Sequence, residues 1–504
     1  MESLWKSAAE PVAGTPFESG ARADVVVVGA GMTGLSTAVI LARAGLHVIV
    51  VESGGVAELA SGSNTGKLSL LQGSVLSTLR AHHPASLVRA YVDANRAGAE
   101  WLIGFAEESG IPFTRRTAYS YAQTPAGRAD VDAEFAAARE AGLAVRRDSA
   151  VDAPFPIDSA VALEDQVAID PAAVAAALAR AFLAAGGVLH AGVRVTRAHT
   201  LPHPGVETDA GPVHADHVVL ATGAPIATRG LYWMKTRGLR SYCVSFAIDA
   251  PVPDGLFLSV DGPPRSIRSV TAHDGPATGL VVGGNGHPVG RSDSERAAVD
   301  DLVAWTTRHF PDAVETFRWS AQDYESHDLI PFAGALPRGL GRIRFATGYG
   351  KWGLSNGPAA AMRIAGEILG TPRPAWVRTI GTRMTVPADI GRGAVELGAV
   401  AGAAVSGWVS SETRPTPVAR PAEGEGVVAH SAGRPVAVST VDGVTRAVGA
   451  ICPHLGGILT WNDADCTWDC PLHASRFAPD GTRIEGPAVR DLAHLRASGP
   501  PMRE

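Results

Sequence analysis

The chain lacks most of the features that mark a secreted or membrane-spanning protein. Its 504 residues include only four cysteines, too few for the disulfide framework of a secreted scaffold. The N-terminus has no basic stretch followed by an apolar one, so we predict no signal peptide. The most apolar run, Ala394 to Val409, is short and interrupted by Glu396, which predicts a helix packed on protein and not a membrane span. We therefore predict a cytoplasmic protein with no membrane partner.

An excess of positive charge is also missing. The formal net charge is −6, which gives no reason to expect nucleic acid or an anionic membrane as a partner. Hydrophobic residues make up 46% of the chain and charged residues 19%, as in ordinary globular proteins. At roughly 150 residues per domain, the length predicts about three domains. Three of the four cysteines lie between residues 452 and 470, and this clustering favours a metal site over disulfides.

A nucleotide-binding motif stands near the N-terminus. Four valines, Val25 to Val28, predict a strand that is buried on both faces. The turn G-x-G-x-x-G follows, with Gly29, Gly31 and Gly34 at its three glycine positions, and a helix comes next. Glu52 ends the second strand, where an acid can accept a ribose hydroxyl and disfavours a 2′-phosphate. The sequence therefore predicts a site for FAD or NAD and not NADP, with a chance glycine turn as the alternative.

Other stretches rich in small residues extend this prediction. Ala60 to Gly73 could let the backbone approach a flat ligand, or it could be a flexible loop. Val218 to Pro225 places small residues at the carboxyl end of a predicted parallel strand, where ligands bind in doubly wound sheets. The turn Gly348 to Gly353 precedes a helix predicted from about Pro358, so it can approach a ligand and stabilise negative charge. Gly284 to Gly286 is interpreted as structural and not as a second nucleotide site, because Pro288 takes the place of the expected helix start and the last glycine of the motif is misplaced.

The remaining segments predict how the domains are arranged. Met1 to Arg22 is expected to lie along the surface, with Trp5 as an anchor. Asp170 is a predicted helix N-cap because a proline follows it. Several strand-like runs between Ser241 and Gly284 predict an antiparallel sheet of a second domain. Thr371 to Pro421 is interpreted as a long linker that contains one helix and wraps the body.

A second constellation lies near the C-terminus. Cys452, His454, Cys470 and His473 form the pattern C-x-H-x15-C-x2-H. Two thiolates and two imidazoles suit a [2Fe–2S] cluster with both cysteines on one iron and both histidines on the other. Zinc is the alternative, although zinc fingers usually pair their cysteines first and their histidines second; a site without metal is the third reading. Cys466 is interpreted as a spare core thiol.

Both motif sets resemble known families. The pieces VVVVGAGMTGLS, SNTGK, VLATGAP, DLIPFAG and ATGYGKWG resemble FAD-dependent oxidoreductases of the D-amino-acid oxidase and glycine oxidase superfamily over about the first 370 residues. The segment from about residue 423, with CPHLGG and WDCPLHASRFAPDGTRIEGPAVRDL, resembles a Rieske domain. The whole chain is similar to a bacterial group of FAD oxidoreductases with a C-terminal Rieske domain.

The resemblance implies an α/β fold in which a Rossmann-like, doubly wound FAD-binding domain is interleaved with an antiparallel-sheet substrate domain and followed by an all-β Rieske domain. The implied boundaries are 1–83, 151–230 and 326–370 for the FAD-binding domain, 84–150 and 231–325 for the substrate domain, 371–420 for a linker with a helix, and 421–504 for the Rieske domain.

The resemblance also implies the cofactors and their contacts. The cofactors are FAD and a [2Fe–2S] cluster, and the cluster ligands are Cys452, His454, Cys470 and His473. The implied FAD contacts are Gly29, Gly31, Gly34, Glu52, Thr65, Gly66, Lys67, Val195, Thr222, Gly223, Gly348, Tyr349, Lys351, Trp352 and Gly353.

Departures from the family patterns bear on the substrate. The amino-acid oxidases often present an arginine before a proline to clamp the substrate carboxylate, whereas this chain has Gln322-Asp323-Tyr324 in that region. Asp323 would suit a cationic amine, and Lys351 could stabilise the reduced flavin, so these two are the candidate catalytic residues. Other clamps could come from arginines elsewhere: Arg240, Arg265 or Arg268. Gly457 and Leu472 stand where many Rieske proteins have two further cysteines that form a disulfide.

Three functions remain open from the sequence. In the first, a small amine or amino-acid-like substrate reduces the flavin, which passes electrons to the cluster and then to an external carrier, ferredoxin-like or a reductase. In the second, an external reductase feeds the cluster, which reduces the flavin for a reductive or oxygenating reaction on a small molecule, such as a secondary metabolite. In the third, the protein transfers electrons or senses redox state without a substrate of its own.

Overall fold

The computed structural model describes residues 1–148, 150–227, 229–271, 277–381, 387–413, 420–431 and 433–494. The chain forms two compact units. Unit 1 comprises Met1–Gly223, Arg240–Gly286 and Ala298–Ile390, and unit 2 comprises Ala224–Leu239, His287–Ala297 and Gly391–Glu504. Two segments from the middle of the sequence thus belong to the same unit as the C-terminal region. The finer division of unit 1 into FAD-binding and substrate domains stays a prediction.

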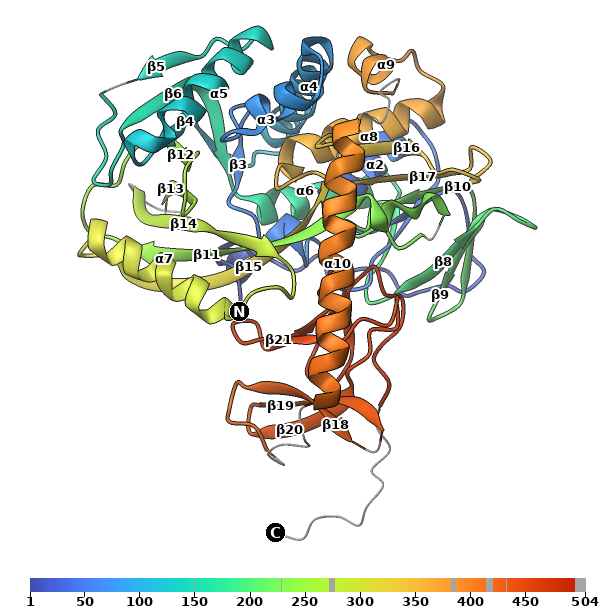
Figure 1. The fold of residues 1–504 in the computed structure, drawn as a ribbon. Helices are drawn as coiled ribbons and strands as arrows, with labels where there is room; N and C mark the ends of the chain where they lie inside the picture. The colour runs from blue at the N-terminus through green and yellow to red at the C-terminus, as the bar shows by residue number, and fades with distance from the viewer. Residues whose placement is uncertain are drawn as a thin grey trace. The chain divides into compact units, whose positions relative to one another are not determined.

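A mixed sheet with a parallel centre belongs to unit 1 (Figure 1), and its strands in the described chain run in the order β16-β17-β10-β1-β2-β7. Its edge strand β16 is antiparallel to β17, and β9, which also pairs with β8, is antiparallel to β10. Strand β1 pairs in parallel with β10 on one side and with β2 on the other, and Val25 to Val28 are at most 4% exposed. The valine run is therefore buried on both faces, as the sequence predicts. The bounds are β1 Arg22–Val28, β2 Val48–Val51, β7 Val188–His190, β8 Val195–His199, β9 Gly205–Thr208, β10 Pro212–Leu220, β16 Phe332–Ala335 and β17 Ile343–Thr347.

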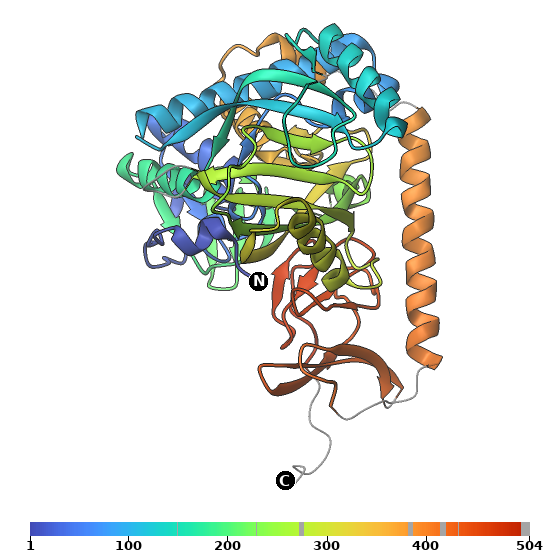
Figure 2. The same ribbon diagram turned by 90° about the vertical axis from the view of Figure 1, so that its left-hand side faces the viewer.

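A second sheet completes unit 1, with the described strands in the order β15-β11-β14-β13-β12-β4-β6-β3 and β5 beside β6. Most pairs are antiparallel, as predicted, but β12 pairs with β4 in parallel. Figure 2 shows this sheet with helices on both sides, α5 against β4 and β6 and α7 near β14. The bounds are β3 Lys67–Leu68, β4 Phe113–Ala122, β5 Arg146–Asp148, β6 Ser159–Ile169, β11 Thr236–Ala247, β12 Leu256–Ser259, β13 Arg265–Thr271, β14 Ala277–Pro288 and β15 Val314–Ser326.

Two helices of unit 1 test the predicted helix starts, and one of the two predictions is wrong. Asp170 caps α6 by accepting hydrogen bonds from the N–H groups of Ala172 and Ala173, as predicted. Helix α8 begins at Gly353 and not near Pro358, because the N–H of Asn356 already closes the first turn on the carbonyl of Trp352. The bounds are α1 Leu4–Ala8, α2 Met32–Arg43, η1 Ala60–Gly62, α3 Val75–His82, α4 Ala85–Glu108, η2 Pro125–Gly127, α5 Arg128–Glu140, α6 Pro171–Ala184, α7 Glu295–His309, α8 Gly353–Leu369 and α9 Ala375–Gly381.

The N-terminal segment is mostly exposed and is anchored by Trp5, as predicted. It forms the short helix α1, and Trp5 is only 5% exposed. The Trp5 indole donates a hydrogen bond to the carbonyl of Asn64 at 2.7 Å, and the Ser3 hydroxyl donates to that of Gly62 at 2.6 Å. The small-residue loop that follows β2 is therefore held by the N-terminus, which argues against the reading of this loop as flexible.

Unit 2 is built from β-strands and one long helix. Its described strands form two antiparallel sheets, β18-β19-β20 and β21-β22-β23-β24, as expected for the predicted all-β C-terminal domain. Helix α10, Pro387–Thr413, is longer than predicted, and its Val400, Ala403 and Ala404 pack against the core of unit 2. The bounds are η3 Arg229–Met234, β18 Gly426–Ser431, β19 Arg434–Val441, β20 Val444–Gly449, β21 Thr460–Asn462, β22 Thr467–Asp469, β23 Arg476–Phe477 and β24 Arg483–Glu485.

Among the residues that the structure describes, no helix combines the length and apolar character needed to cross a bilayer. The cytoplasmic location stays a prediction.

Candidate functional site

The glycine turn after β1 is packed too closely for any side chain. Gly29 has a φ of +107°, and a Cβ atom at Gly34 would lie 1.9 Å from the carbonyl oxygen of Gly29. A Cβ at Gly31 would lie 2.9 Å from the hydroxyl of Ser61, which accepts the N–H of Met32 at the start of α2. Strand, turn and helix N-terminus therefore meet at a point that backbone N–H groups line, as an anionic diphosphate requires.

Glu52 is fixed at the same place. Its carboxylate accepts hydrogen bonds from the N–H of Ala30 at 2.7 Å and from that of Gly54 at 2.8 Å. The hydroxyl of Ser53 donates to it as well, at 3.1 Å. Glu52 thus holds the glycine turn in shape, and its ribose contact stays a prediction. Val195 lies at the start of β8, nearly buried, and its predicted adenine contact stays a prediction.

The loop Thr65-Gly66-Lys67 is tied to the second sheet. Gly66 has a φ of +67°, and its carbonyl accepts a 2.7 Å hydrogen bond from Arg268. Lys67 is 7% exposed and donates to the carbonyl of Phe257 and to the hydroxyl of Ser266. Burial holds the pKa of Lys67 well below its usual range. Lys67 therefore bridges the loop to β12 and β13, whereas its predicted place beside the flavin ring is not tested.

Two strand ends and a turn bring the other predicted flavin contacts together. Gly223 has a φ of +66°, and its carbonyl accepts a hydrogen bond from the hydroxyl of Thr347, directly before the turn that starts at Gly348. Tyr349 in this turn hydrogen-bonds through its hydroxyl to Thr33 of α2 at 2.8 Å. The carboxyl ends of β10 and β17 thus meet the N-terminal end of α2, as expected in a doubly wound sheet.

Asp323 acts on the backbone of this turn. Its half-buried carboxylate accepts the N–H of Lys351, and the N–H of Gly350 donates to the carbonyl of Tyr324 at 2.9 Å. Burial raises the pKa of Asp323, while its hydrogen bonds from backbone N–H groups and the charge of Lys351 lower it. Lys351 has a φ of +75°, which a free chain would avoid. Asp323 thus anchors an unfavourable turn, and a contact with substrate stays a prediction.

Sequence reasoning missed one face of the second sheet. A Cβ at Gly286 would lie 2.5 Å from Lys351 Nζ and 2.7 Å from Ser241 Oγ. A Cβ at Gly283 would lie 3.1 Å from Cys243 Sγ and 3.7 Å from a methyl carbon of Thr65. The glycines that were read as purely structural therefore open the space where these side chains gather. The signal in the sequence was the repeated glycine in LVVGGNG, opposite small polar residues of β11.

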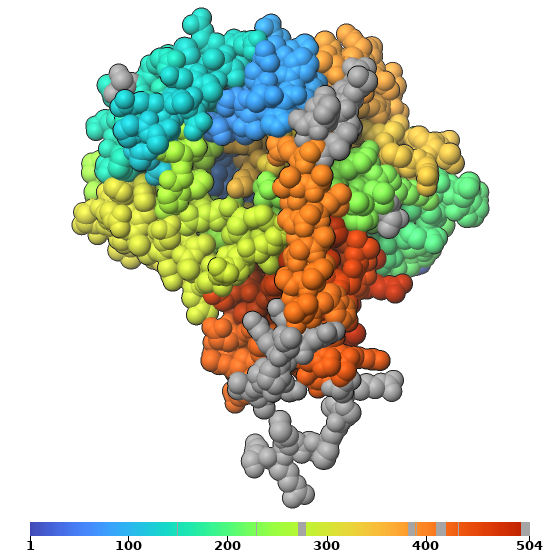
Figure 3. All heavy atoms as spheres, viewed as in Figure 1, coloured from blue at the N-terminus to red at the C-terminus, as the bar shows by residue number. Residues whose placement is uncertain are grey.

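This face is the candidate substrate site. The hydroxyl of Ser241 is buried and has no hydrogen-bond partner in the described part of the chain. Burial raises the pKa of the Cys243 thiol to about 12, so it stays neutral. Figure 3 shows a hollow between the blue segment of α3 and α4 and the yellow-green segment of β12 to β14, with dark-blue N-terminal atoms at its floor. A small polar molecule could be received here.

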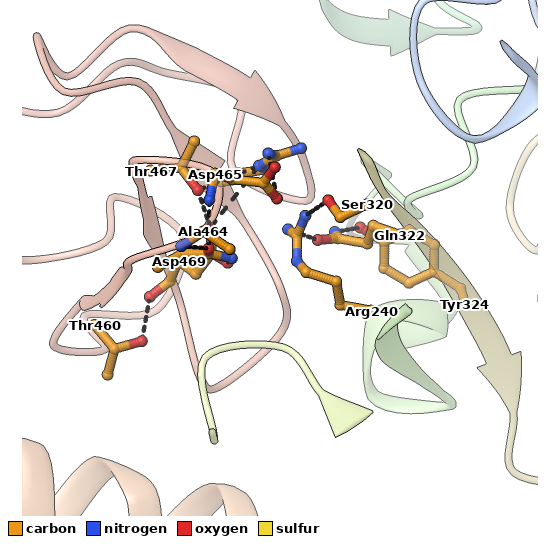
Figure 4. Close-up of polar contacts among 11 residues, drawn as sticks. Arg240, Ser320, Gln322, Tyr324, Thr460, Ala464, Asp465, Thr467 and Asp469 are labelled. Atoms are coloured by element: carbon orange, nitrogen blue, oxygen red, sulfur yellow. Dashed lines mark hydrogen bonds and ion pairs between the residues drawn. The ribbon is translucent and has the colours of Figure 1, made fainter. Parts of the chain in front are cut away.

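The three arginines considered as carboxylate clamps all have protein partners. Arg240 is fully buried and donates to Ser320 and Gln322 at 2.8 Å each (Figure 4). Because side chains alternate along a strand, Arg240 points to the opposite face of β11 from Ser241. Arg265 pairs with Asp301 at 2.6 Å, and Arg268 donates to the loop carbonyl described above. Each of the three arginines therefore supports the protein's own structure through these contacts.

In unit 2, two loops bring together the four predicted cluster ligands. The N–H of Cys452 donates to the carbonyl of Gly457, and that of Cys470 to the carbonyl of Ser475, each at 2.8 Å. The two thiols are within hydrogen-bond reach, and this bond lowers the pKa of Cys452 and raises that of Cys470. The ring centroids of His454 and His473 lie 5.1 Å apart. Each loop therefore supplies one thiol and one imidazole to a common centre.

The state of the histidines fits metal ligation. Burial lowers the pKa of His454 to about 4 and is also the main cause of the fall to about 4 for His473. Both rings are therefore neutral near pH 7, as ligands must be. The Nδ1 atom of each is buried and has no hydrogen-bond partner among the described residues. Two orphaned nitrogens beside two paired thiols match the donor set of a [2Fe–2S] cluster with mixed ligands.

The described residues contain no group of three or more His, Cys, Asp or Glu side chains that could hold one metal ion. A [2Fe–2S] cluster needs no such group, because each of its irons takes only two protein ligands. The paired arrangement of thiols and imidazoles therefore fits the cluster reading.

The surroundings of the loops explain two other sequence features. A Cβ at Gly457 would lie 2.6 Å from Cγ of Leu472, so these residues pack where other Rieske proteins are expected to have a disulfide. Cys466 is partly exposed at a φ of +54°, which corrects its reading as a core thiol. Its neighbour Asp465 pairs with Arg476 at 2.9 Å, in the network of Figure 4 that also links Thr467 to Asp469.

Comparison with protein families agrees with both sites. A family described as FAD dependent oxidoreductase (DAO) matches residues 24–366, and one described as Rieske [2Fe-2S] domain matches residues 416–496. YhfW of Bacillus subtilis (strain 168), whose name places it among Rieske 2Fe-2S iron-sulfur proteins, is 25% identical over 98% of this chain and 97% of its own. A cytochrome b6-f complex iron-sulfur subunit of Nostoc sp. is 38% identical over 78 residues, and the match covers only 44% of that subunit.

Solved structures share the fold of the larger part. Glycine oxidase from Geobacillus kaustophilus has a TM-score of 0.62 at 19% identity, and the match covers 73% of this chain and all of that one. L-proline dehydrogenase from P. horikoshii has a TM-score of 0.58 at 15% identity, and the match covers 74% of this chain and 99% of that one. L-amino acid deaminase from Proteus myxofaciens has a TM-score of 0.59 at 18% identity, and the match covers 74% of this chain and 96% of that one.

Proposed function

Because the chain belongs to the FAD-dependent oxidoreductase family and carries a Rieske [2Fe–2S] domain, we propose that it oxidises an amine or amino-acid-like small molecule and passes electrons between FAD and the cluster. The protein is an enzyme that binds both cofactors. The observation that carries the proposal is the presence, in one chain, of a tightly packed glycine turn with Glu52 and of two loops with two thiols and two unprotonated imidazoles.

The substrate class rests on similarity of fold and on the candidate substrate face. The glycine oxidase, L-proline dehydrogenase and L-amino acid deaminase named above carry amino acids in their names. In this chain the face offers Ser241 Oγ and Lys351 Nζ, a neutral hydroxyl and a cation, around Gly286. A cation beside a hydroxyl can receive a carboxylate or another anionic group of the substrate. We therefore favour an amino-acid-like compound over a simple cationic amine.

The residues have separate tasks in this proposal. When bound, FAD accepts a hydride from a C–H bond next to nitrogen, and the cluster takes up electrons one at a time. The N-terminus of α2 and Glu52 hold the nucleotide part of FAD. Asp323 fixes the turn that carries Lys351. In this proposal the charge of Lys351 and the start of α8 would stabilise the negative charge that develops on the flavin.

An external one-electron carrier completes the proposed reaction, since the cluster must be reoxidised before it can take the next electron. The carrier is a ferredoxin-like protein or a reductase. In the reverse direction, such a partner would feed the cluster and the substrate would be reduced or oxygenated. The direction of electron flow depends on whether the substrate or the external carrier reduces the flavin.

An anaerobic substrate screen tests the proposal. We expect the flavin absorption of the purified protein to bleach with one or more of glycine, N-alkylglycines, proline and other α-amino acids. The matched control is 2-aminoisobutyrate, whose carbon next to nitrogen carries no hydrogen; it should bind without bleaching. Bleaching only when a reduced external carrier is added, with no response to any amine, would contradict the oxidative direction and support the reverse one.

A further inference from the structure

Three aromatic rings meet edge to face at the histidine pair of unit 2. The indole ring of Trp233 lies 5.0 Å from the ring of His454 at an interplanar angle of 88°, and 4.7 Å from that of His473 at 86°. The two imidazoles are themselves perpendicular, at 85°. Ring pairs at these separations and angles attract one another. Trp233 therefore contacts both histidine ligands at once and bridges the two cluster loops.

Trp233 lies outside the Rieske sequence. It belongs to the 3-10 turn η3, which falls between strands β10 and β11 of the FAD-dependent oxidoreductase match. Gly230 and Leu231 of this turn have φ values of +76° and +52°, so the backbone bends sharply just before the indole. The segment follows directly after Gly223, one of the predicted flavin contacts, and it leads into β11, which carries Ser241. The chain that contacts the histidines is thus continuous with the flavin motif at one end and with the candidate substrate face at the other.

Other contacts within unit 2 hold this segment in place. A Cβ at Gly486 would lie 3.2 Å from a methyl carbon of Ile226 and 3.4 Å from Cβ of Ala224. The second inserted segment braces the other cluster loop, because Arg291 donates to the carbonyl of Pro471 at 2.9 Å and pairs with Glu396 at 2.7 Å. The position of Trp233 is therefore supported from both sides of the cluster loops.

Packing alone does not explain a tryptophan here. Its Nε1 is buried and has no hydrogen-bond partner among the described residues, which is unfavourable for an indole N–H. Phenylalanine would offer an apolar ring without that cost. The contact with both ligand imidazoles is the feature that distinguishes the position.

We infer that Trp233 is a positioning residue for electron exchange at the cluster: it packs against both ligand imidazoles, holds them in their mutual orientation and shields part of the histidine edge. This inference rests on the proposed function for its redox role. The step is the transfer of one electron to or from the iron pair, with no bond made or broken. Both imidazoles stay partly exposed beside Trp233, so the indole shields one side of the histidine pair.

The covering role is tested without turnover. The loaded protein is treated with diethyl pyrocarbonate, and carbethoxylation of each histidine is followed by peptide mass mapping, with exposed His47 as the internal standard. We expect Trp233→Ala to raise the rates at His454 and His473 by about tenfold or more, since two aromatic contacts are lost. Trp233→Phe should keep the protection. Leu231→Ala, an exposed position on the same turn, is the matched control and should change nothing.

The redox role is tested on the same variants. The flavin is reduced by light with 5-deazaflavin and oxalate under anaerobic conditions, and reduction of the cluster is followed by electron paramagnetic resonance. We expect transfer to slow by about tenfold or more in Trp233→Ala and to stay within about threefold of wild type in Trp233→Phe, at equal iron content. If the alanine variant loses iron, Trp233→Leu replaces it, because leucine fills space without a ring.

The outcomes separate the inference from the proposed function. Unchanged histidine protection in Trp233→Ala, or equal transfer rates in the leucine and phenylalanine variants, would overturn the role of Trp233. A wild-type protein that shows no transfer from flavin to cluster would instead contradict the proposed function, while the carbethoxylation result would still decide whether Trp233 covers the histidines.

Discussion

Replacing Gly34 with alanine is expected to abolish stable FAD binding. The new Cβ would lie 1.9 Å from the carbonyl oxygen of Gly29 and 3.4 Å from Cβ of Ala221, so the turn and the start of α2 would have to move apart. Because the collision is with backbone, no side-chain rotation relieves it. We expect the dissociation constant for FAD to rise at least about a hundredfold, and most flavin to be lost on desalting.

Gly104→Ala is the matched control. Gly104 also lies inside a helix, α4, but an added Cβ would meet nothing within 4 Å. Alanine favours helix over glycine by about 1 kcal/mol, so this variant should keep its FAD and be slightly more stable. The measurement is flavin absorbance per protein after desalting, together with iron content. An alanine at Gly34 that keeps its flavin would contradict the assignment of the glycine turn.

Cys470→Ala should remove the cluster and leave the flavin in place. Cys470 is 2% exposed and shares a hydrogen bond with Cys452, so the remaining thiol and the two imidazoles cannot complete the two-plus-two donor set. Iron and acid-labile sulfide should fall from about two of each per chain to near zero. FAD content should not change, because the glycine turn lies in the other unit.

Cys466→Ala controls for the loss of a cysteine as such. Cys466 lies four residues before Cys470, is partly exposed, and is not one of the predicted cluster ligands. This variant should keep its full iron and sulfide content. Loss of the cluster from Cys466→Ala, or stoichiometric zinc in place of iron in the wild type, would contradict the ligand assignment.

Local patterns were enough to predict much of the fold. The valine run of β1, the cap at Asp170 and the alternating strands of the second sheet depend on neighbouring residues, so the sequence expresses them directly. The start of α8 was predicted wrongly, because the backbone N–H of Asn356 closes a turn on the carbonyl of Trp352 that no local pattern marks. Trp5 was expected to be an anchor, but its partner, the carbonyl of Asn64, is distant in the sequence and could not be named.

The residues of the candidate site also fall into two groups, those that local motifs mark and those that depend on distant contacts. The four cluster ligands and the glycine turn stand in short, specific patterns, so their residues could be named from the sequence. The face around Ser241, Cys243 and Gly286 could not be, because it is made by two strands whose pairing no local motif records. Trp233 was missed for the same reason: nothing near it in the sequence indicates that it contacts His454 and His473.

The central claim is that electrons pass between flavin and cluster within one chain. It is tested most directly by reducing the flavin with light in the wild-type protein and following flavin reoxidation and cluster reduction together, at several protein concentrations. Flavin-free protein under the same light shows how much reduction reaches the cluster directly. We expect the cluster to be reduced as the flavin is reoxidised, with a rate constant that does not depend on protein concentration. A cluster that stays oxidised beside reduced flavin, or a rate that rises in proportion to protein concentration, would contradict it.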